Sequence, residues 1–317
     1  MIRLRRFFAC LLPALTAALL SSRSREIPVG GQAVIEGVLM RGPCRWALAV
    51  RPPEGGIWTK SWMARPWNAS MPWSLPVLRG VATMGEMLVT GFRAISLSAQ
   101  VALGEEEKIG PLELAATFAV AIVGVVGLFI ILPVWISDIG IRFFKVDPFW
   151  LHLIEGVARA VVFIGYIAII GLWKDISRVF AYHGAEHKTI NAWESGASLD
   201  IDTVSGFSRI HARCGTSFLL VVIAVSVIVF AAAGQGSIIW RILSRVILLP
   251  VVIGISYEII RWCSRNSFFG RILMAPALWL QYLTTREPDS DQIEVAISSL
   301  NLALEDNAGP IACNGGE

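Results

Sequence analysis

Long apolar runs almost without charge constrain this 317-residue chain more than any other feature of its sequence. The first run, LAATFAVAIVGVVGLFIILPVWI at residues 114–136, contains no charged residue at all. About 20 consecutive apolar residues suffice for a helix to cross the hydrocarbon layer of a bilayer. Shorter runs of similar character lie at 157–173, 218–233 and 246–260. We therefore predict a mainly α-helical, integral membrane protein with about four transmembrane helices.

The overall composition agrees with a membrane protein and argues against binding to nucleic acid. Hydrophobic residues make up 55% of the chain and charged residues only 16%, whereas ordinary soluble domains contain about 25% charged residues. The formal net charge is only +3, which gives little attraction for a polyanion. We expect membrane lipids, and not nucleic acid, as partners of the chain.

Positively charged residues are distributed unevenly between the segments that flank the apolar runs. Thirteen lysines and arginines precede the first run, and five lie in residues 174–216. The two other loops hold two each, which are Arg142 with Lys145 and Arg241 with Arg245. Lysine and arginine are enriched on the cytoplasmic side of membrane proteins. We therefore predict a multi-pass protein of the cell (cytoplasmic) membrane, with both termini and the 174–216 loop in the cytoplasm.

The residues before the first apolar run divide into a leader, a small cap and a helical segment. Residues 1–26 have a basic start and an apolar stretch, as in a poorly ordered leader or N-terminal anchor. Residues 27–75 contain short apolar runs bounded by glycine and proline, which predict a β-rich cytoplasmic cap. In this cap, WALAV and GIWTK can pair as a hairpin across RPPEGG. The spacing in residues 76–110 predicts amphipathic helices on the membrane surface or on the cap.

Residues 111–265 form the predicted four-helix transmembrane region, and shorter helices follow it. Residues 266–305 begin with an apolar stretch that Gly270 and Pro276 interrupt, which predicts an interfacial or re-entrant piece. An amphipathic cytoplasmic helix comes next. Its candidate N-caps are Asp289 and Ser290, and its apolar stripe comprises Ile293, Ile297, Leu300 and Leu304. We expect a disordered tail over residues 306–317.

The segment AYHGAEHKTINAWESG at residues 181–196 contains two of the four histidines in the chain. The apolar spacing around it predicts a helix that ends at Gly196. His183 and His187 then lie one turn apart on the same face, close enough to share one ion. Together with Glu186 they spell H-x-x-E-H, the inverted form of a zinc-hydrolase motif. In such motifs the histidines bind Zn²⁺ and the glutamate acts as the catalytic general base.

His211 and Cys214 in HARCG add a third imidazole and a thiol downstream of that helix. The predicted ligands of a divalent metal, with Zn²⁺ as the expected ion, are His183, His187, His211 and Cys214. A site that uses all four is closed and structural, whereas three ligands and a water make a catalytic site. We favour three histidines and water, with Cys214 as a fourth ligand or as a neighbouring thiol. Glu258 is an alternative third ligand, unless it forms an ion pair with Arg261.

Charged residues and thiols outside this cluster have simpler interpretations. Glu155 and Arg159 lie four residues apart in the second apolar run, so we expect them to pair at the membrane edge. A proton or ion pathway is less favoured because the first and third runs contain no charge. Glu194 lies about 10 Å along the helix from His187. We therefore expect it to contact a ligand without binding the ion itself, or to lie on the surface. The five cysteines have no disulfide-like spacing and are expected to be thiols.

Four long, separated motifs of the chain resemble the bacterial YqhQ-type membrane proteins. The motifs are GGQAVIEGVLMRGP, YHGAEHKTINAWE, HARCGTSF and LWLQYLTTREPDSDQIEVAISSL, and the resemblance covers about residues 28–304. Members of that family are generally described as predicted metal-dependent enzymes without an established reaction. The resemblance implies a metal site at His183, Glu186, His187, His211 and Cys214, and it implies no substrate.

These features lead to two hypotheses about function. The leading one is a metal-dependent hydrolase whose ion lies at the cytoplasmic membrane face and acts on a lipid-linked or other membrane-associated substrate, with Glu186 as general base. The alternative is a non-enzymatic membrane assembly factor or scaffold. In this hypothesis a structural metal stabilises the fold of the 174–216 loop, and the cap recruits a membrane protein partner. A transporter would need a polar path through the spans, and the sequence shows little of one.

Overall fold

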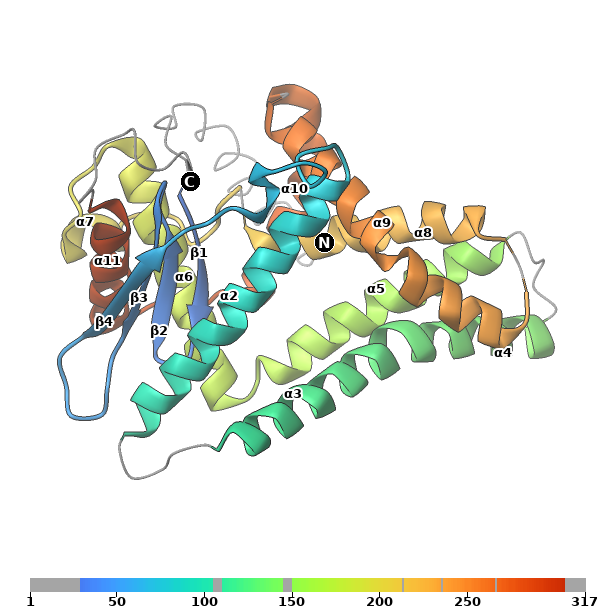
Figure 1. Cartoon of the computed structure of the whole chain (residues 1–317), viewed down its shortest axis with the longest axis horizontal. Coiled ribbons are helices and arrows are strands. Elements are labelled where there is room, and N and C mark those ends of the chain that lie inside the picture. Colours follow the sequence, from blue (N-terminus) through green and yellow to red (C-terminus); the bar gives the residue numbers. More distant parts are fainter. Residues whose placement is uncertain are drawn as a thin grey trace, which may run out of the picture.

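The computed structural model describes residues 29–104, 110–144, 150–212, 214–234, 236–265 and 267–305 (Figure 1). The predicted leader at 1–26 and tail at 306–317 lie outside the described residues. A cap built on a small sheet lies at one end of the molecule, and a bundle of long helices extends away from it (Figure 1). The prediction of a mainly helical chain with a small N-terminal sheet is confirmed.

Four short strands form an antiparallel sheet in the cap and follow one another in sequence order. They are β1 (Gly30–Val34), β2 (Gly37–Arg41), β3 (Arg45–Val50) and β4 (Trp58–Met63). The register pairs Val50 with Trp58, which confirms the predicted hairpin across RPPEGG. Gly55 and Gly56 in that connection have φ angles of 91° and 76°, a left-handed conformation that glycine adopts without steric penalty.

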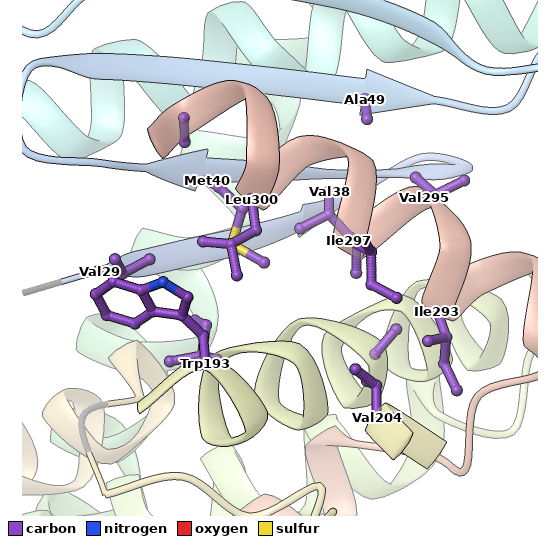
Figure 2. Packing of buried hydrophobic residues seen from close by; sticks show 14 of the residues in the cluster. Val29, Val38, Met40, Ala49, Trp193, Val204, Ile293, Val295, Ile297 and Leu300 are labelled. Carbon is purple, nitrogen blue, oxygen red and sulfur yellow. The ribbon is translucent and has the colours of Figure 1, made fainter. Parts of the chain in front are cut away.

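Side chains alternate between the two faces of the sheet, and helices cover both faces. On one face Val38 and Met40 pack against Leu300 in a core shared by α6 (Lys174–Ser195), α7 (Ile201–Ser205) and α11 (Ser290–Leu304) (Figure 2). On the other face Leu39 and Leu48 join a cluster with Ala94 of α2 (Leu78–Leu103). The cap predicted at residues 27–75 is therefore completed by helices from much later in the chain.

The amphipathic segment and the C-terminal helix form largely as predicted. A short helix, η1 (Trp67–Ala69), precedes α2, which is one continuous helix of 26 residues. Asp289 is the N-cap of α11, with a reciprocal hydrogen bond between its backbone and Gln292. Such a capping arrangement satisfies two backbone N–H groups that a helix start leaves unpaired.

Four helices of the described residues are long and apolar enough to cross a membrane, which confirms the predicted number and indicates a membrane protein. The helices of this bundle are α3 (Pro111–Val126), the π-helical turn η2 (Gly127–Ile131), α4 (Leu132–Phe144), α5 (Leu151–Ile170), α8 (Gly215–Ala232) and α9 (Ile238–Arg265). The candidate spans are Ala115–Gly140, Leu151–Ile170, Gly215–Ala232 and Ile238–Cys263. The first span therefore joins α3, η2 and α4.

The fourth span begins earlier than predicted, so the interpretation of Arg241 and Arg245 as loop residues is wrong. Both lie within α9, and their exposed fractions are only 3% and 0%. This burial was not predictable from local patterns, because the acidic partner, Glu155, comes from α5, about 90 residues away. Buried charges are tolerated where such partners compensate them.

The predicted break in the stretch after the fourth span is also wrong. Helix α10 runs from Ser267 to Thr284 through both Gly270 and Pro276. A Cβ atom at position 270 would collide with the carbonyl of Cys263 in α9. Glycine here therefore permits close approach of two helices and does not interrupt one.

The cysteines differ in one respect from the expected five thiols. Cys214 and Cys263 are free and buried, as expected. Cys44, in the turn before β3, forms a disulfide, so the prediction of a thiol is wrong at this position.

Candidate metal centre

The two histidines of the H-x-x-E-H motif lie on one face of α6, as predicted. The helix spans Lys174–Ser195 and ends at Gly196, whose φ of 79° and ψ of 14° place it in the left-handed region. The ring centroids of His183 and His187 are 4.4 Å apart. Gly196 removes the steric cost of this helix end, and the helical repeat brings residues four apart together.

Backbone carbonyls fix the orientation of both imidazole rings. Nδ1 of His183 lies 2.9 Å from the carbonyl oxygen of Thr284, and Nδ1 of His187 lies 2.7 Å from that of Arg209. Because a carbonyl oxygen only accepts hydrogen bonds, Nδ1 carries the proton in each neutral ring. The Nε2 atoms are then left with free lone pairs, which is the usual arrangement for histidines that bind a metal.

Cys214 brings its sulfur to the same place from the start of α8. It is the N-cap of that helix, and the N–H of Thr216 points to its Sγ at 3.4 Å. The sulfur lies 3.2 Å from Nε2 of His183. One donor atom each from His183, His187 and Cys214 lies within 4.8 Å of the others. Tetrahedral zinc separates such donors by about 3.3–3.6 Å, given the usual bond lengths, so small side-chain movements would accommodate the ion.

Two buried polar atoms at this centre lack hydrogen-bond partners among the described residues. They are Nε2 of His187 and Oε2 of Glu186, and both side chains are almost completely buried. Buried polar atoms in proteins are nearly always hydrogen-bonded. An unpaired nitrogen lone pair and an unpaired carboxyl oxygen on consecutive residues of α6 therefore fit a site for a cation and a water molecule.

The cap closes this centre over Glu186. Gly31 of β1 lies so near that a Cβ atom there would be 2.9 Å from Cδ and Oε1 of Glu186. Glu36, in the turn after β1, accepts hydrogen bonds from Arg178 and Tyr182 of α6. Gly31, the second glycine of GGQAVIEG, thus provides space for this carboxylate.

Burial and mutual charge determine the protonation of the metal-free centre. Burial raises the pKa of the Cys214 thiol, but His187 and His183 outweigh it and hold this pKa well below its usual value. Burial likewise opposes the charged form of His183, yet the Cys214 thiolate raises its pKa to about 9. Burial lowers the pKa of His187. Without a metal, a protonated His183 faces a thiolate and His187 stays neutral.

Glu186 is the fourth ionisable group of the centre. Burial raises its pKa to about 8, with His183 opposing the shift and Cys214 adding to it. A carboxyl group with such a pKa can both accept and release a proton near neutral pH. This is the property required of a general base or acid.

His211 lies beside the three donors, but its side chain is directed elsewhere. Its ring centroid is 5.7 Å from that of His187, and its Nε2 lies 3.3 Å from Oε1 of Glu194. Its backbone N–H and carbonyl are both hydrogen-bonded to the side chain of Gln281 in α10. The structure therefore groups His183, His187 and Cys214 without His211, whose role as a ligand stays a prediction.

Two other residues considered from the sequence also have defined partners. Glu194 contacts His211, because the segment after α7 folds back along α6. Glu258 is not part of the three-donor group, since Arg79 of α2 holds it through two hydrogen bonds of 2.7 and 2.5 Å.

Gln281, which is fully buried, was not identified from the sequence; the available signal was a glutamine within the apolar segment LWLQYL.

Comparisons with known proteins agree with the motifs of the chain. Residues 75–306 match a family model described as "Protein of unknown function (DUF1385)". The "Uncharacterized protein YqhQ" of Bacillus subtilis (strain 168) is 33% identical over 293 residues, which cover 87% of this chain and 92% of that protein. No solved structure matches the chain. The chain thus belongs to the DUF1385 family of proteins of unknown function.

Proposed function

We propose that the chain is a metal-dependent, hydrolase-like membrane protein with Zn²⁺ as its expected ion. His183, His187 and Cys214 would hold the ion. The observation that carries the proposal is that one donor atom from each of these three residues converges on one point. Nδ1 of each histidine is bonded to a carbonyl, which leaves Nε2 for the ion, and the pKa of the cysteine is strongly lowered. Such a group of donors suits a cation, because imidazole and thiolate are the ligands that zinc prefers.

The ligand number supports a catalytic role. Three protein ligands leave one position of a tetrahedral zinc ion open, as in catalytic zinc sites. When bound in such a site, zinc supplies a water molecule whose pKa is near 7. Glu186, with its unpaired Oε2, is the residue that would take up a proton there. Gly31 leaves this carboxylate the space it occupies.

The position of the centre supports a substrate that arrives from the membrane. Helix α6 begins at Lys174, shortly after the span Leu151–Ile170, and Cys214 directly precedes the span Gly215–Ala232. Because His183 contacts Cys214 and His187 lies against His183, the donors lie near the start of the span Gly215–Ala232. The excess of lysine and arginine before the first span and within 174–216 supports a cytoplasmic location, because Arg241 and Arg245 no longer count as loop charges. A lipid-linked or other membrane-associated molecule is the substrate class that fits.

A structural metal in an assembly factor is the second candidate, and the position of His211 favours it. Its ring is near enough to His187 that rotation of the side chain away from Glu194 would supply a fourth ligand. A closed site with four protein ligands has no place for water and is structural. The number of ligands therefore separates the two functions.

Metal analysis of the purified protein and its single variants tests the proposal. We expect about one zinc per chain, lost in His183→Ala, His187→Ala and Cys214→Ser but retained in His211→Ala. Cys263→Ser, which removes the second free buried thiol among the described residues, is the matched control and should retain the metal. Loss of zinc in His211→Ala would favour the structural site. A wild-type protein without bound metal after metal-replete purification would refute both.

A further inference from the structure

A second cluster of charged residues lies among the candidate spans, at their ends away from the metal centre. Three arginines surround Glu155 of α5, which is only 1% exposed. Its Oε1 accepts hydrogen bonds from Arg159 at 2.8 Å and from Arg245 at 2.9 Å, and its Oε2 accepts one from Arg245 at 2.7 Å. Arg241 lies 3.6 Å from the same Oε2. The predicted pairing of Glu155 with Arg159 is thus only part of a larger cluster.

The cluster lies at the opposite ends of the helices that lead to the metal centre. Glu155 is near the start of α5, whereas His183 follows the end of that helix. Arg241 is near the start of α9, which follows the end of α8, whereas Cys214 precedes the start of α8. Figure 1 shows the cap and the far ends of these helices at opposite sides of the molecule.

The charges in this cluster do not balance among the described side chains. Arg159, Arg241 and Arg245 carry three positive charges, whereas Glu155 and Asp138, which lies 3.6 Å from Arg241, carry two negative ones. Nδ1 of His152 lies 3.3 Å from Nη2 of Arg245. Since a guanidinium only donates, this ring nitrogen accepts and the ring is neutral. Among the described side chains, one positive charge is therefore left without a counter-charge, which is unfavourable in an apolar environment.

Neutral groups take up most of the remaining guanidinium N–H donors. Arg159 donates to the carbonyl of Phe129 in the π-helical turn η2 and to Ser226 of α8. Arg241 donates to the carbonyl of Val134 and to the hydroxyl of Ser137 in α4. Nε of Arg241 is buried without a hydrogen-bond partner among the described residues. Arg241 is therefore the member of the cluster at which a further negative group would be bound.

Aromatic residues place Arg241 at the depth of the lipid headgroups. Trp135 of α4, Trp150 just before α5, and Trp240 of α9 are each about half exposed at this end of the bundle. Exposed tryptophans in membrane proteins concentrate at the level of the headgroups. Trp240 is the sequence neighbour of Arg241, so this guanidinium lies where phosphate groups of the lipid are present.

An apolar groove provides space for the rest of a lipid. It has a volume of about 460 Å³ and lies between α4 and α5, with Ile136, Leu153, Val157 and Val161 among its lining residues. Ile136 is the neighbour of Ser137, which binds Arg241, and Leu153 is the neighbour of His152. The groove therefore begins at the level of the charged cluster and continues toward the middle of the span.

We propose that Arg241 binds the singly charged phosphodiester of a phospholipid, with one acyl chain in the groove between α4 and α5. A phosphodiester supplies the single negative charge that the cluster lacks. Nε of Arg241 is the guanidinium donor left to bind a phosphate oxygen, and such charge-assisted hydrogen bonds are stronger than those between neutral groups. This site is independent of the metal centre and depends only on the placement of the bundle in a membrane.

Native mass spectrometry of the full-length, delipidated protein in detergent tests the site. The probes are phosphatidylglycerol, diacylglycerol without a phosphate, and inorganic phosphate alone. We expect phosphatidylglycerol to bind at least tenfold more tightly than diacylglycerol. Arg241→Gln should weaken phosphatidylglycerol at least tenfold, whereas Arg261→Gln, the same change near the other end of α9, should leave it unchanged.

Asp138→Asn tests the charge argument with a variant whose expected gain in affinity cannot result from misfolding. This variant removes a competing carboxylate from Arg241, so we expect it to bind phosphatidylglycerol more tightly than the wild type. Equal affinity for phosphatidylglycerol and diacylglycerol, or equal effects of Arg241→Gln and Arg261→Gln, would overturn the site. If inorganic phosphate binds as tightly as phosphatidylglycerol, the proposal of a lipid ligand is overturned and the site binds a soluble oxyanion instead.

Discussion

Gly31 of the first strand lies directly against the carboxyl group of Glu186 in α6. The contact joins two segments that are 155 residues apart in the sequence, and it makes the N-terminal cap part of the candidate metal centre. Glu36 extends the same contact by its hydrogen bonds to Arg178 and Tyr182. The cap therefore acts on the group that we propose as the general base.

Gly31→Ala should disturb the centre, because the added methyl group would lie 2.9 Å from three atoms of the buried Glu186 side chain. Overpacking of this kind lowers the free energy of unfolding by about 1–3 kcal/mol. Gly30→Ala is the matched control, since nothing lies within 4 Å of a Cβ atom at position 30. Thermal unfolding of both variants measures the difference; equal stability of the two would contradict the packing described.

Glu186→Gln should retain zinc and lose turnover, because the amide cannot accept the proton that a general base takes up. General base catalysis contributes about a hundredfold to ten-thousandfold to a rate. The measurement pairs metal content with hydrolysis of fluorogenic lipid esters and phosphodiesters by the reconstituted protein. Glu113→Gln, at the exposed start of α3, serves as the control. Loss of zinc in Glu186→Gln would instead identify this carboxylate as a ligand.

Zinc affinity should rise with pH up to about pH 9. His183 has a pKa of about 9 in the metal-free protein, so below this pH the ion must displace a proton from it. Displacement of one proton raises the apparent affinity about tenfold per pH unit. Calorimetric titrations at pH 7 in two buffers with different ionisation enthalpies should count about one released proton. Binding without proton release would show that His183 is not a ligand.

The raised pKa of Glu186 affects the stability of the metal-free protein. The ordinary pKa of this group is 4.5, and burial raises it to about 8. The contribution of the protonated carboxyl group to stability is therefore fully present below pH 4.5 and is lost as the pH rises through about 8. The raised pKa of His183 and the lowered pKa of Cys214 offset each other, because the folded and the unfolded pair each bind one proton between pH 6.5 and about 9. The unfolding temperature of the metal-free protein should therefore fall up to about pH 8, and that of Glu186→Gln should fall less.

Acid should weaken the contact between the cap and α6. The hydrogen bond from Arg178 lowers the pKa of Glu36 below 4.5, with burial opposing this shift. The stabilisation is therefore fully present above pH 4.5 and is lost as the pH falls through the lowered pKa. Glu36→Gln should remove this part of the acid dependence, worth at most about 1 kcal/mol for a partly exposed pair. Unfolding curves measured from about pH 5 down to about pH 2, where the lowered pKa of Glu36 takes effect, provide the check, with Glu54→Gln as control.

The sequence predicted those parts of the structure that depend on local patterns. The helical spacing and Gly196 located α6, and the RPPEGG segment located the hairpin of β3 and β4. The four apolar runs located the four candidate spans. In each case the residues that determine the element lie within it or next to it.

Features that depend on distant partners were not predictable in this way. In the sequence, Arg245 has the features of a loop cation, but in the structure it is paired with Glu155, 90 residues away. Glu258 likewise has the features of a metal ligand, but it is bound by Arg79, 179 residues away. The carbonyl groups of Thr284 and Arg209 that orient the two histidines have no signature in the sequence, because every residue has such a group.

The position of α11 on the sheet has a consequence for the synthesis of the protein. The hydroxyl of Ser299 binds the carbonyl of Ala47, 252 residues earlier in the chain, and Leu300 covers the same face of the sheet (Figure 2). The strands leave the ribosome before the helix that covers them. Until α11 has been synthesised, α6 and α7 are the described helices that can shield this apolar face. A chain that terminates before residue 290 would keep the face open and become a target for chaperones and proteases.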